Sequence, residues 1–436
     1  MKSRNYWLGT KYLMITMILW QGISFSALAH EGEVETGTAN PKIPKSPRCQ
    51  ILTAARLFDG VNFPQDNMAV LIEGNKVKQV GSLNQLRGLC RNKINLGDAT
   101  ILPGFIESHA HITFQNVRKD TVLEHGITTV QDTGGPLIKP KGGQGALRLL
   151  SVGPIIQAEG GYPLNIFTHP SPGGAYDQIG YPISPASTET EVKDVVQNLV
   201  DGGATAIKIA LEPGGEIGAP WMQPHDGPVP LTPWAMLSLD QVKWIVAKAH
   251  ALDRRVIAHV GEQTGFDLAV EGGVDELAHM PCAAISEPSL HAAVDAGVTF
   301  VTTIDTLGSC AGIHANAHEV THIMEHNPGT GSEFIYGSEV AHDNVPWGIN
   351  GEEMHMILHL THGEGDIDFI DVVNVFRSAT SRAGENLGID KLGTLTPGAP
   401  ADIIAVRGNP FERFKILEYP DLVMSGGRTI VNKFKK

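Results

Sequence analysis

Residues 101–111 read ILPGFIESHAH, and this stretch divides the chain into two kinds of pattern. Before Pro103 and Gly104, short apolar runs resemble hairpin strands, whereas after them strands alternate with helices. If residues 105–111 form a strand, side chains two positions apart face the same side, so His109 and His111 enter one cavity. The two histidines of this H-x-H pair could also be ordinary polar residues at a strand end, so their interpretation depends on the rest of the sequence.

Downstream of this stretch, apolar runs alternate with helical stretches. The pattern predicts strands at 105–111, 128–131, 155–158, 206–210, 256–260, 276–279, 299–303 and 334–338. It predicts helices at 189–201, 238–252, 263–271, 287–296, 315–326 and 368–384. This alternation is typical of an α/β fold with parallel strands, and the number of strands favours a closed (β/α)₈ barrel over an open doubly wound sheet.

The two ends of the chain have a different pattern. A polar leader at 30–47 precedes strand-like runs at 48–100, and similar runs return at 392–436 after the predicted barrel segment 101–391. The simplest explanation is that the two ends fold together.

Residues 1–29 have the pattern of a secretory signal peptide. Basic residues precede an apolar run at 12–25, which leads to a cleavage site at Ala27-Leu28-Ala29. The run is shorter than the roughly 20 residues of a spanning helix, which argues against the alternative of a membrane anchor. We expect an exported protein, periplasmic or secreted, that is not held in the membrane after cleavage.

Composition excludes some classes of partner and suggests one type of cross-link. A formal charge of −14 over 436 residues argues against a nucleic-acid binder held by bulk charge. In an oxidising compartment, Cys49 and Cys90 are candidates for a disulfide within the N-terminal unit. Cys282 with Cys310 is a weaker sequential pair, and free buried thiols are the alternative.

Lys208 lies in the run TAIKIA at 205–210. Alternation places Ala206, Lys208 and Ala210 on one face of a strand, and a lysine among small residues inside a barrel loses its hydration. Desolvation lowers the pKa of the amine, and a neutral amine takes up carbon dioxide to give a carbamate that can bridge two metal ions. A structural ion pair is the alternative for this lysine.

His259 and His279 each end a predicted strand. In (β/α)₈ barrels the active site lies at the carboxyl ends of the strands, so both imidazoles are expected at that face. Together with His109, His111 and Lys208 they form a set of ligands suited to Zn²⁺ or a similar divalent ion.

With these residues identified, the sequence resembles the amidohydrolase superfamily, and most closely its imidazolonepropionase-like members. The resemblance covers about 47–434 and rests on PGFIESHAH at 103–111, GITTVQD at 126–132, Lys208, His259, His279 and GTLTPGAPADII at 393–404. It implies a (β/α)₈ barrel beside a small β-sandwich built from both chain ends. It also implies two divalent ions, expected to be Zn²⁺: one on His109 and His111, the other on His259 and His279, bridged by carboxylated Lys208.

Two positions depart from the family pattern. Glu107 stands where the family usually has Asp, two residues before His109. The acid of the eighth strand normally belongs to a G-T-D run, but here the run reads YGSE at 336–339. Register favours Glu339 as the metal-facing general base, residue type favours Asp343, and an inactive site is the third reading.

The resemblance implies hydrolysis of a C–N amide bond in a small substrate, a dipeptide or an N-acyl amino acid, by a metal-bound hydroxide. A cyclic-amide hydrolase or deaminase is the alternative within the superfamily, and a catalytically silent metal-binding or ligand-binding relative is the alternative outside catalysis. The expected partner is a small molecule rather than nucleic acid or membrane, and assembly into a homo-oligomer is left open.

Further polar and aromatic residues have no assigned role at this stage. His314, His318, His322 and His326 recur every four residues on one predicted helix face, and His355, His359 and His362 recur on another. A solvated or substrate-proximal face is the simpler interpretation, and a surface metal site is the alternative. The aromatic residues Tyr162, Tyr176 and Trp221 fall in long loops that shape the mouth of a pocket or merely pack there.

Overall fold

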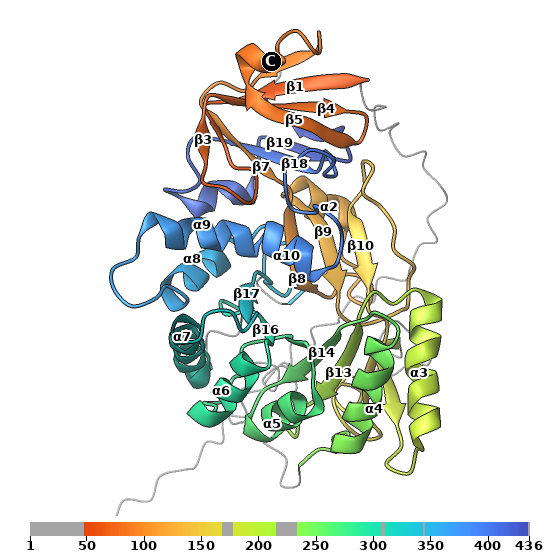
Figure 1. Ribbon diagram of the computed structural model, residues 1–436. Helices are drawn as coiled ribbons and strands as arrows, with labels where there is room; N and C mark the ends of the chain where they lie inside the picture. Colours follow the sequence, from red (N-terminus) through yellow and green to blue (C-terminus); the bar gives the residue numbers. More distant parts are fainter. Residues whose placement is uncertain (1–47, 168–177, 215–232, 307–309, 343–344, 435–436) are drawn as a thin grey trace, which may run out of the picture. The chain divides into compact units, whose positions relative to one another are not determined.

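The apolar runs of the central segment form parallel strands in two sheets (Figure 1). The computed structural model describes residues 48–167, 178–214, 233–306, 310–342 and 345–434, all within the unit 43–436. The first sheet has the order β10-β9-β8, with β8 at Phe105–Ala110, β9 at Ile127–Asp132 and β10 at Arg148–Ser151. The second has the order β12-β11-β13-β14-β15-β16-β17. Its members are β11 Ile155–Ala158, β12 Gly180–Ile183, β13 Ile207–Leu211, β14 Val256–Val260, β15 Glu276–Leu277, β16 Thr299–Val301 and β17 Glu333–Ile335.

Backbone hydrogen bonds join the two parallel sheets at both ends. The Thr205 N–H donates to Ser151 O at 2.9 Å, beside β10 and β13. At the other edge, the His111 N–H donates to Val340 O at 2.9 Å, beyond β8 and β17. Closure of a (β/α)₈ barrel requires hydrogen bonds at both of these junctions. The bonds are compatible with the predicted barrel, which itself stays a prediction.

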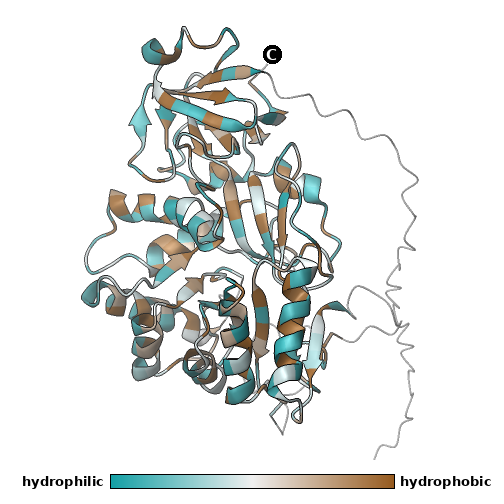
Figure 2. Cartoon of the chain, turned by 45° about the vertical axis from the view of Figure 1, so that its right-hand side comes forward, coloured by the Kyte–Doolittle hydropathy of each residue, from teal (hydrophilic) through white to brown (hydrophobic). Residues whose placement is uncertain are grey.

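Helices connect the strands, and several of them begin at a residue whose side chain caps the first turn. They are α2 Lys119–Glu124, α3 Glu189–Gly202, α4 Leu239–His250, α5 Gln263–Gly272, α6 Glu287–Asp295, α7 Ala311–His326, α8 Gly351–Leu360, α9 Phe369–Ser378 and α10 Ser381–Asn386. Thr188 and Ser238 form capping boxes at the starts of α3 and α4. Hydrophobic and hydrophilic residues alternate along these helices (Figure 2), as expected for helices with one packed face.

One predicted helix is divided in the structure, and two short strands were not predicted. The predicted helix 368–384 is two helices, because Thr380 has a non-helical backbone and its hydroxyl donates to Phe376 O at 2.6 Å. The short strands β10 and β12 were missed, and the predicted strand at 155–158 is β11, which pairs with β12 in the other sheet. Helical periodicity does not reveal a break when both halves of a pattern remain amphipathic.

The two chain ends pair with each other, as expected. Strand β18 Ile403–Arg407 is antiparallel to β7 Ala99–Pro103, with Ile403 opposite Pro103. The blue strands β18 and β19 lie beside the N-terminal strands in Figure 1. One sheet has the order β20-β19-β18-β7-β2-β3 and the other β5-β4-β1-β6. Their bounds are β1 Cys49–Thr53, β2 Arg56–Leu57, β3 Gln65–Asp66, β4 Met68–Glu73, β5 Lys76–Ser82, β6 Lys93–Asn95, β19 Leu422–Ser425 and β20 Arg428–Asn432, with α1 at Leu83–Leu86 and a 3₁₀ helix at Phe414–Glu418.

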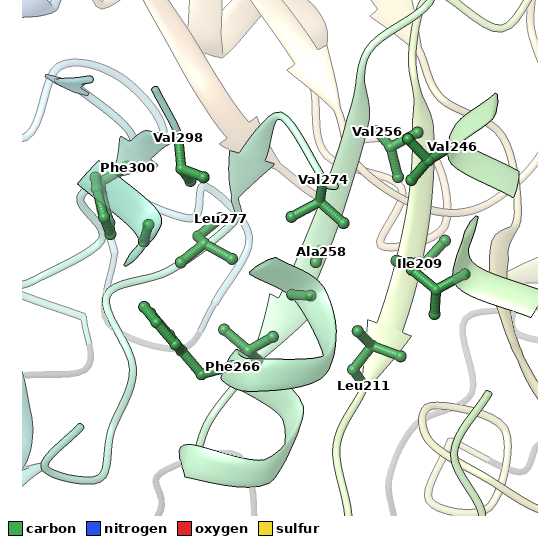
Figure 3. Packing of buried hydrophobic residues seen from close by; sticks show 14 of the residues in the cluster. Ile209, Leu211, Val246, Val256, Ala258, Phe266, Val274, Leu277, Val298 and Phe300 are labelled. Atoms are coloured by element: carbon green, nitrogen blue, oxygen red, sulfur yellow. The ribbon is translucent and has the colours of Figure 1, made fainter. Parts of the chain in front are cut away.

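Apolar packing between strands and helices fixes the ends of the parallel strands. Phe266 of α5 lies near Leu277 of β15 and Phe300 of β16 in Figure 3, and all three are fully buried. Truncating a buried phenylalanine to alanine costs roughly 3–5 kcal/mol, so this layer contributes strongly to stability.

Two disulfides join Cys49 to Cys90 and Cys282 to Cys310. Within the described residues, every helix is too short or too polar to cross a bilayer.

Candidate metal centre

Four imidazoles from three strands lie together at the carboxyl ends of those strands. His109 is in β8, His111 follows it, His259 is in β14 and His279 comes two residues after β15. Ring centroids are 5.1 Å apart for His109 and His111, 4.5 Å for His109 and His279, and 5.2 Å for His259 and His279. We call these four residues with Lys208 the buried histidine group. Parallel strands whose ends meet at one edge explain why distant residues converge.

Lys208 lies within the buried histidine group on β13, where only 2% of its surface is exposed. Burial lowers the pKa of its amine to about 7, although the nearby carboxylates of Glu276 and Glu339 oppose the shift. The positive charge of Lys208 in turn lowers the pKa of all four histidines. The lysine is therefore close to the imidazoles and, near neutral pH, is partly in its uncharged form.

The imidazoles have the protonation state that metal ligands require. Burial is the largest cause that lowers each histidine pKa, to about 3 for His111. Both ring nitrogens of His109 are buried without a hydrogen-bond partner among the described residues. Buried polar atoms normally have partners, so these orphaned nitrogens fit a set of ligands for a metal ion.

A hydroxyl group orients one of the rings. His279 Nδ1 lies 2.9 Å from Thr303 Oγ1, and Thr303 adopts a positive φ of 44° immediately after the strand region of β16. A hydrogen bond at Nδ1 fixes the ring and leaves Nε2 available to a metal ion, which is the usual outer-shell arrangement for a histidine ligand. Sequence reasoning missed Thr303, because a single threonine carries no pattern.

Glu339 lies beside the imidazoles, at a position with a φ of 58°. Its Oε1 is 3.8 Å from His111 Nε2, and ligand atoms of His109, His279 and Glu339 lie within 4.8 Å of one another. Burial raises the pKa of the Glu339 carboxyl, while the charges of His342 and Lys208 oppose this rise. The other predicted acid, Asp343, lies outside the described residues.

Glu107 has a larger structural role than its position in the sequence indicated. It is fully buried and accepts hydrogen bonds from the His109 N–H at 2.9 Å, the Ser338 N–H at 2.9 Å and the Ser338 hydroxyl at 2.7 Å. Burial raises its pKa to about 8. The carboxyl thus links the strand of His109 to the segment that carries Glu339, which explains why an acid is needed there.

Two residues beside His259 complete one side of the group. Glu212 Oε2 is 3.8 Å from His259 Nε2, while Glu212 Oε1 accepts from the Gly214 N–H at 2.6 Å. The ring of Tyr162 stacks on His259 with centroids 4.7 Å apart, and Trp234 lies 6.2 Å beyond it. Residues two apart on a strand face the same side, so continuing the alternation from Lys208 would have predicted that Glu212 faces the site. The other loop aromatics, Tyr176 and Trp221, lie outside the described residues.

Comparison with solved structures supports the same architecture at low sequence identity. The chain matches the crystal structure of A. niger ochratoxinase with a TM-score of 0.65 and 19% identity, over 89% of this chain and 97% of that one. An Xaa-Pro dipeptidase with bound methionine matches with a TM-score of 0.64 and 20% identity, over 87% and 99%. Molinate hydrolase matches with a TM-score of 0.67 and 15% identity, over 88% and 95%.

Sequence comparison identifies the family. No curated protein sequence matches the chain. The amidohydrolase family model matches residues 100–430, which include every described residue of the buried histidine group together with Glu107 and Glu339. The family in general binds metal, in agreement with the buried ligands described above. This chain therefore belongs to the amidohydrolase family.

Proposed function

We propose that this protein is an exported hydrolase that cleaves the C–N amide bond of a small substrate, a dipeptide or an N-acyl amino acid, with two divalent metal ions. The observation that carries the proposal is the convergence of four neutral imidazoles and a buried lysine. The fold we propose is a (β/α)₈ barrel beside a β-sandwich of both chain ends, supported by the hydrogen bonds at both sheet junctions.

The residues would divide between the two ions. His109 and His111 would hold one Zn²⁺ and His259 and His279 the other, with carboxylated Lys208 between them. A pKa near 7 supports this role, because an uncharged amine is the form that takes up carbon dioxide. When bound, two divalent ions would lower the pKa of a bound water molecule and polarise the scissile carbonyl.

Glu339 is the group we propose for proton transfer. Its carboxylate is close to His111, and burial raises its pKa, which makes it a better proton acceptor than an exposed carboxylate and suits it to pass the proton to the leaving amine. Glu107 acts as a positioning residue, because it holds Ser338 next to Glu339 through two hydrogen bonds.

The proposed substrate class rests on the site and on the similar structures. An Xaa-Pro dipeptidase and a phenylurea hydrolase are among these structures. Tyr162 stacks on both His259 and Trp234 and so gives this side of the group an aromatic lining, which favours an apolar group next to the scissile bond.

The test combines metal content with turnover on panels of dipeptides and N-acyl amino acids. We expect about two metal ions per chain in the wild type, with a sharp loss of metal and turnover in K208A. The matched control is K243A, since Lys243 forms an exposed ion pair with Glu271 at 3.5 Å. One ion or none, unchanged by K208A, would remove the carbamate from the proposal. Ammonia as the product would indicate a deaminase instead.

Export is proposed separately, on the basis of residues 1–29, which lie outside the described residues. Expression of the full chain in a bacterial host with a periplasm, followed by N-terminal sequencing, tests it. A mature chain that begins at His30 is expected. A chain retained in the cytoplasm with residues 1–29 intact would contradict the proposal.

A further inference from the structure

A second set of histidines lies on and just after two neighbouring helices, and six of its seven members are exposed. Its members are His314, His318, His322 and His326 of α7, His355 and His359 of α8, and His362 just after α8. Helices α7 and α8 contact each other and lie side by side in Figure 1. We call these residues the α7–α8 histidine face. They account for seven of the 18 histidines of the chain, and none of them belongs to the buried histidine group.

One part of this face groups two imidazoles with a carboxylate. His322 and His326 are one helical turn apart, and their ring centroids are separated by 4.3 Å. Ligand atoms of His322, His326 and Glu364 all lie within 4.8 Å of one another, and Glu364 Oε1 is 3.6 Å from His322 Nδ1. Two histidines at i and i+4 on one helix face can bind a single metal ion.

Hydrogen bonds position both sides of this group. His326 Nδ1 lies 2.9 Å from His322 O, so an Nδ1–H donor there leaves the Nε2 lone pair free to bind a metal. The Glu364 N–H donates to Glu325 Oε2 at 3.2 Å, which ties the segment after α8 to α7. The carboxylate of Glu364 is therefore held near the two rings although it comes from another segment.

We propose that His322, His326 and Glu364 form a second, peripheral metal site that binds one divalent transition-metal ion such as Zn²⁺, with water at the remaining positions. Two imidazoles with one carboxylate are ligands that Zn²⁺ accepts, and imidazole favours it over Mg²⁺ or Ca²⁺. The bound ion cross-links α7 to the segment after α8. This site shares no residue with the buried histidine group, so it stands independently of the proposed function.

Two other surface groups are less suited to bind Zn²⁺. His355 and His359 also lie one helical turn apart, with ring centroids separated by 4.4 Å, but among the described residues no carboxylate is grouped with them. Glu287, His291 and Glu319 form a group with a single imidazole and two carboxylates, which suits harder ions such as Mn²⁺ or Mg²⁺. The His355–His359 pair is therefore the matched control.

The test is equilibrium dialysis of the full chain against excess ZnCl₂, followed by measurement of bound zinc. We expect H322A/H326A to bind one zinc ion fewer per chain than the wild type, and E364A to bind the same ion more weakly. H355A/H359A should keep the wild-type zinc content. Equal zinc in the wild type and H322A/H326A would overturn the proposal, and so would an equal loss in H355A/H359A, since that would indicate unspecific binding by the whole face.

A thermal readout distinguishes loss of the site from loss of the fold. All three proposed ligands are exposed, so H322A/H326A should unfold at the wild-type temperature when zinc is absent. Added zinc should then raise the wild-type unfolding temperature more than that of the variant, because a ligand that binds only the folded state stabilises it. Equal increases in the two proteins would contradict the cross-link between α7 and the segment after α8.

Discussion

The buried histidine group and the α7–α8 histidine face contain the same residue type in opposite surroundings. In the buried group, strand ends hold the rings and burial lowers the pKa of His111 to about 3. On the α7–α8 histidine face, the His322 side chain is 52% exposed. The residues grouped with it are His326 on the same helix and Glu364 in the segment after α8. The first arrangement is set by the packing of several strands, whereas the second combines helical spacing on α7 with one carboxylate from the segment after α8.

The comparison teaches that burial, rather than residue type, determines what a histidine cluster can do. Buried neutral rings are pre-organised for metal and can hold it tightly, and among the described residues both ring nitrogens of His109 have no hydrogen-bond partner. Exposed rings compete with water and lose side-chain freedom on binding, so they bind metal more weakly. The predictions below test this contrast, beginning with the largest expected effect.

Glu339→Gln should show the largest effect on activity. Removal of the proposed proton acceptor is expected to lower kcat by roughly 10²–10⁴-fold, the range typical of general acid–base groups. Steady-state kinetics on a substrate found in the panel measures the change. Glu364→Gln, which alters the carboxylate of the exposed group, should leave kcat within twofold or so of the wild type. Equal losses in both variants would break the contrast.

Glu107→Ala should reduce stability more than any single change on the α7–α8 histidine face. It leaves the buried N–H groups of His109 and Ser338 without their acceptor, and each unpaired donor costs roughly 1–3 kcal/mol. Urea unfolding gives the free energy of unfolding. A value for E107A within about 0.5 kcal/mol of the wild type would mean that the linkage between the two strands is unimportant.

The Glu107 carboxyl should also make the free energy of unfolding depend on pH. Its pKa in the folded protein is raised to about 8, so the folded state binds the proton more tightly than the unfolded state does. The associated stability is fully present below the ordinary pKa near 4.5 and is lost as pH rises toward 8. The free energy of unfolding of the wild type should therefore fall relative to that of E107Q between pH 5 and 8. Parallel curves for the two proteins would refute this.

Thr303→Val should weaken metal binding without removing a ligand. The substitution deletes the hydroxyl that orients His279, and loss of such an outer-shell partner typically costs about 10–100-fold in metal affinity. Competition with a zinc chelator measures the change. Thr361→Val is the control, because its hydroxyl only donates to Ile357 O at 2.8 Å on α8. An unchanged affinity in T303V would show that packing alone orients the ring.

His355→Ala with His359→Ala should have the smallest effect. Both side chains are exposed on α8, and substitutions of this kind usually change stability by no more than about 0.5 kcal/mol. Turnover and the free energy of unfolding are expected to match the wild type. A marked loss of turnover would mean that the α7–α8 histidine face communicates with the buried histidine group, and the two regions would no longer be independent.

The sequence determined much of the helical and strand structure by itself. Helices α3 to α6 were predicted to within a few residues, because each has a capping residue and an apolar face at helical spacing. Strands β8, β9, β13 and β14 were recognised from continuous apolar runs. The break between α9 and α10 and the short strands β10 and β12 were missed, because the break depends on a single residue and the strands are too short to show a pattern.

The metal-ligand candidates were also identified from the sequence, since histidines at strand ends and a lysine among small residues form recognisable patterns. Only the tertiary structure gave Glu107 and Thr303 their roles at the site, because these roles depend on contacts with Ser338 and His279 from other parts of the chain. The burial that shifts the pKa of Lys208 likewise exists only in the folded protein. Local spacing specifies which side chains share a strand or a helix face, whereas packing decides which of those faces lose water and meet.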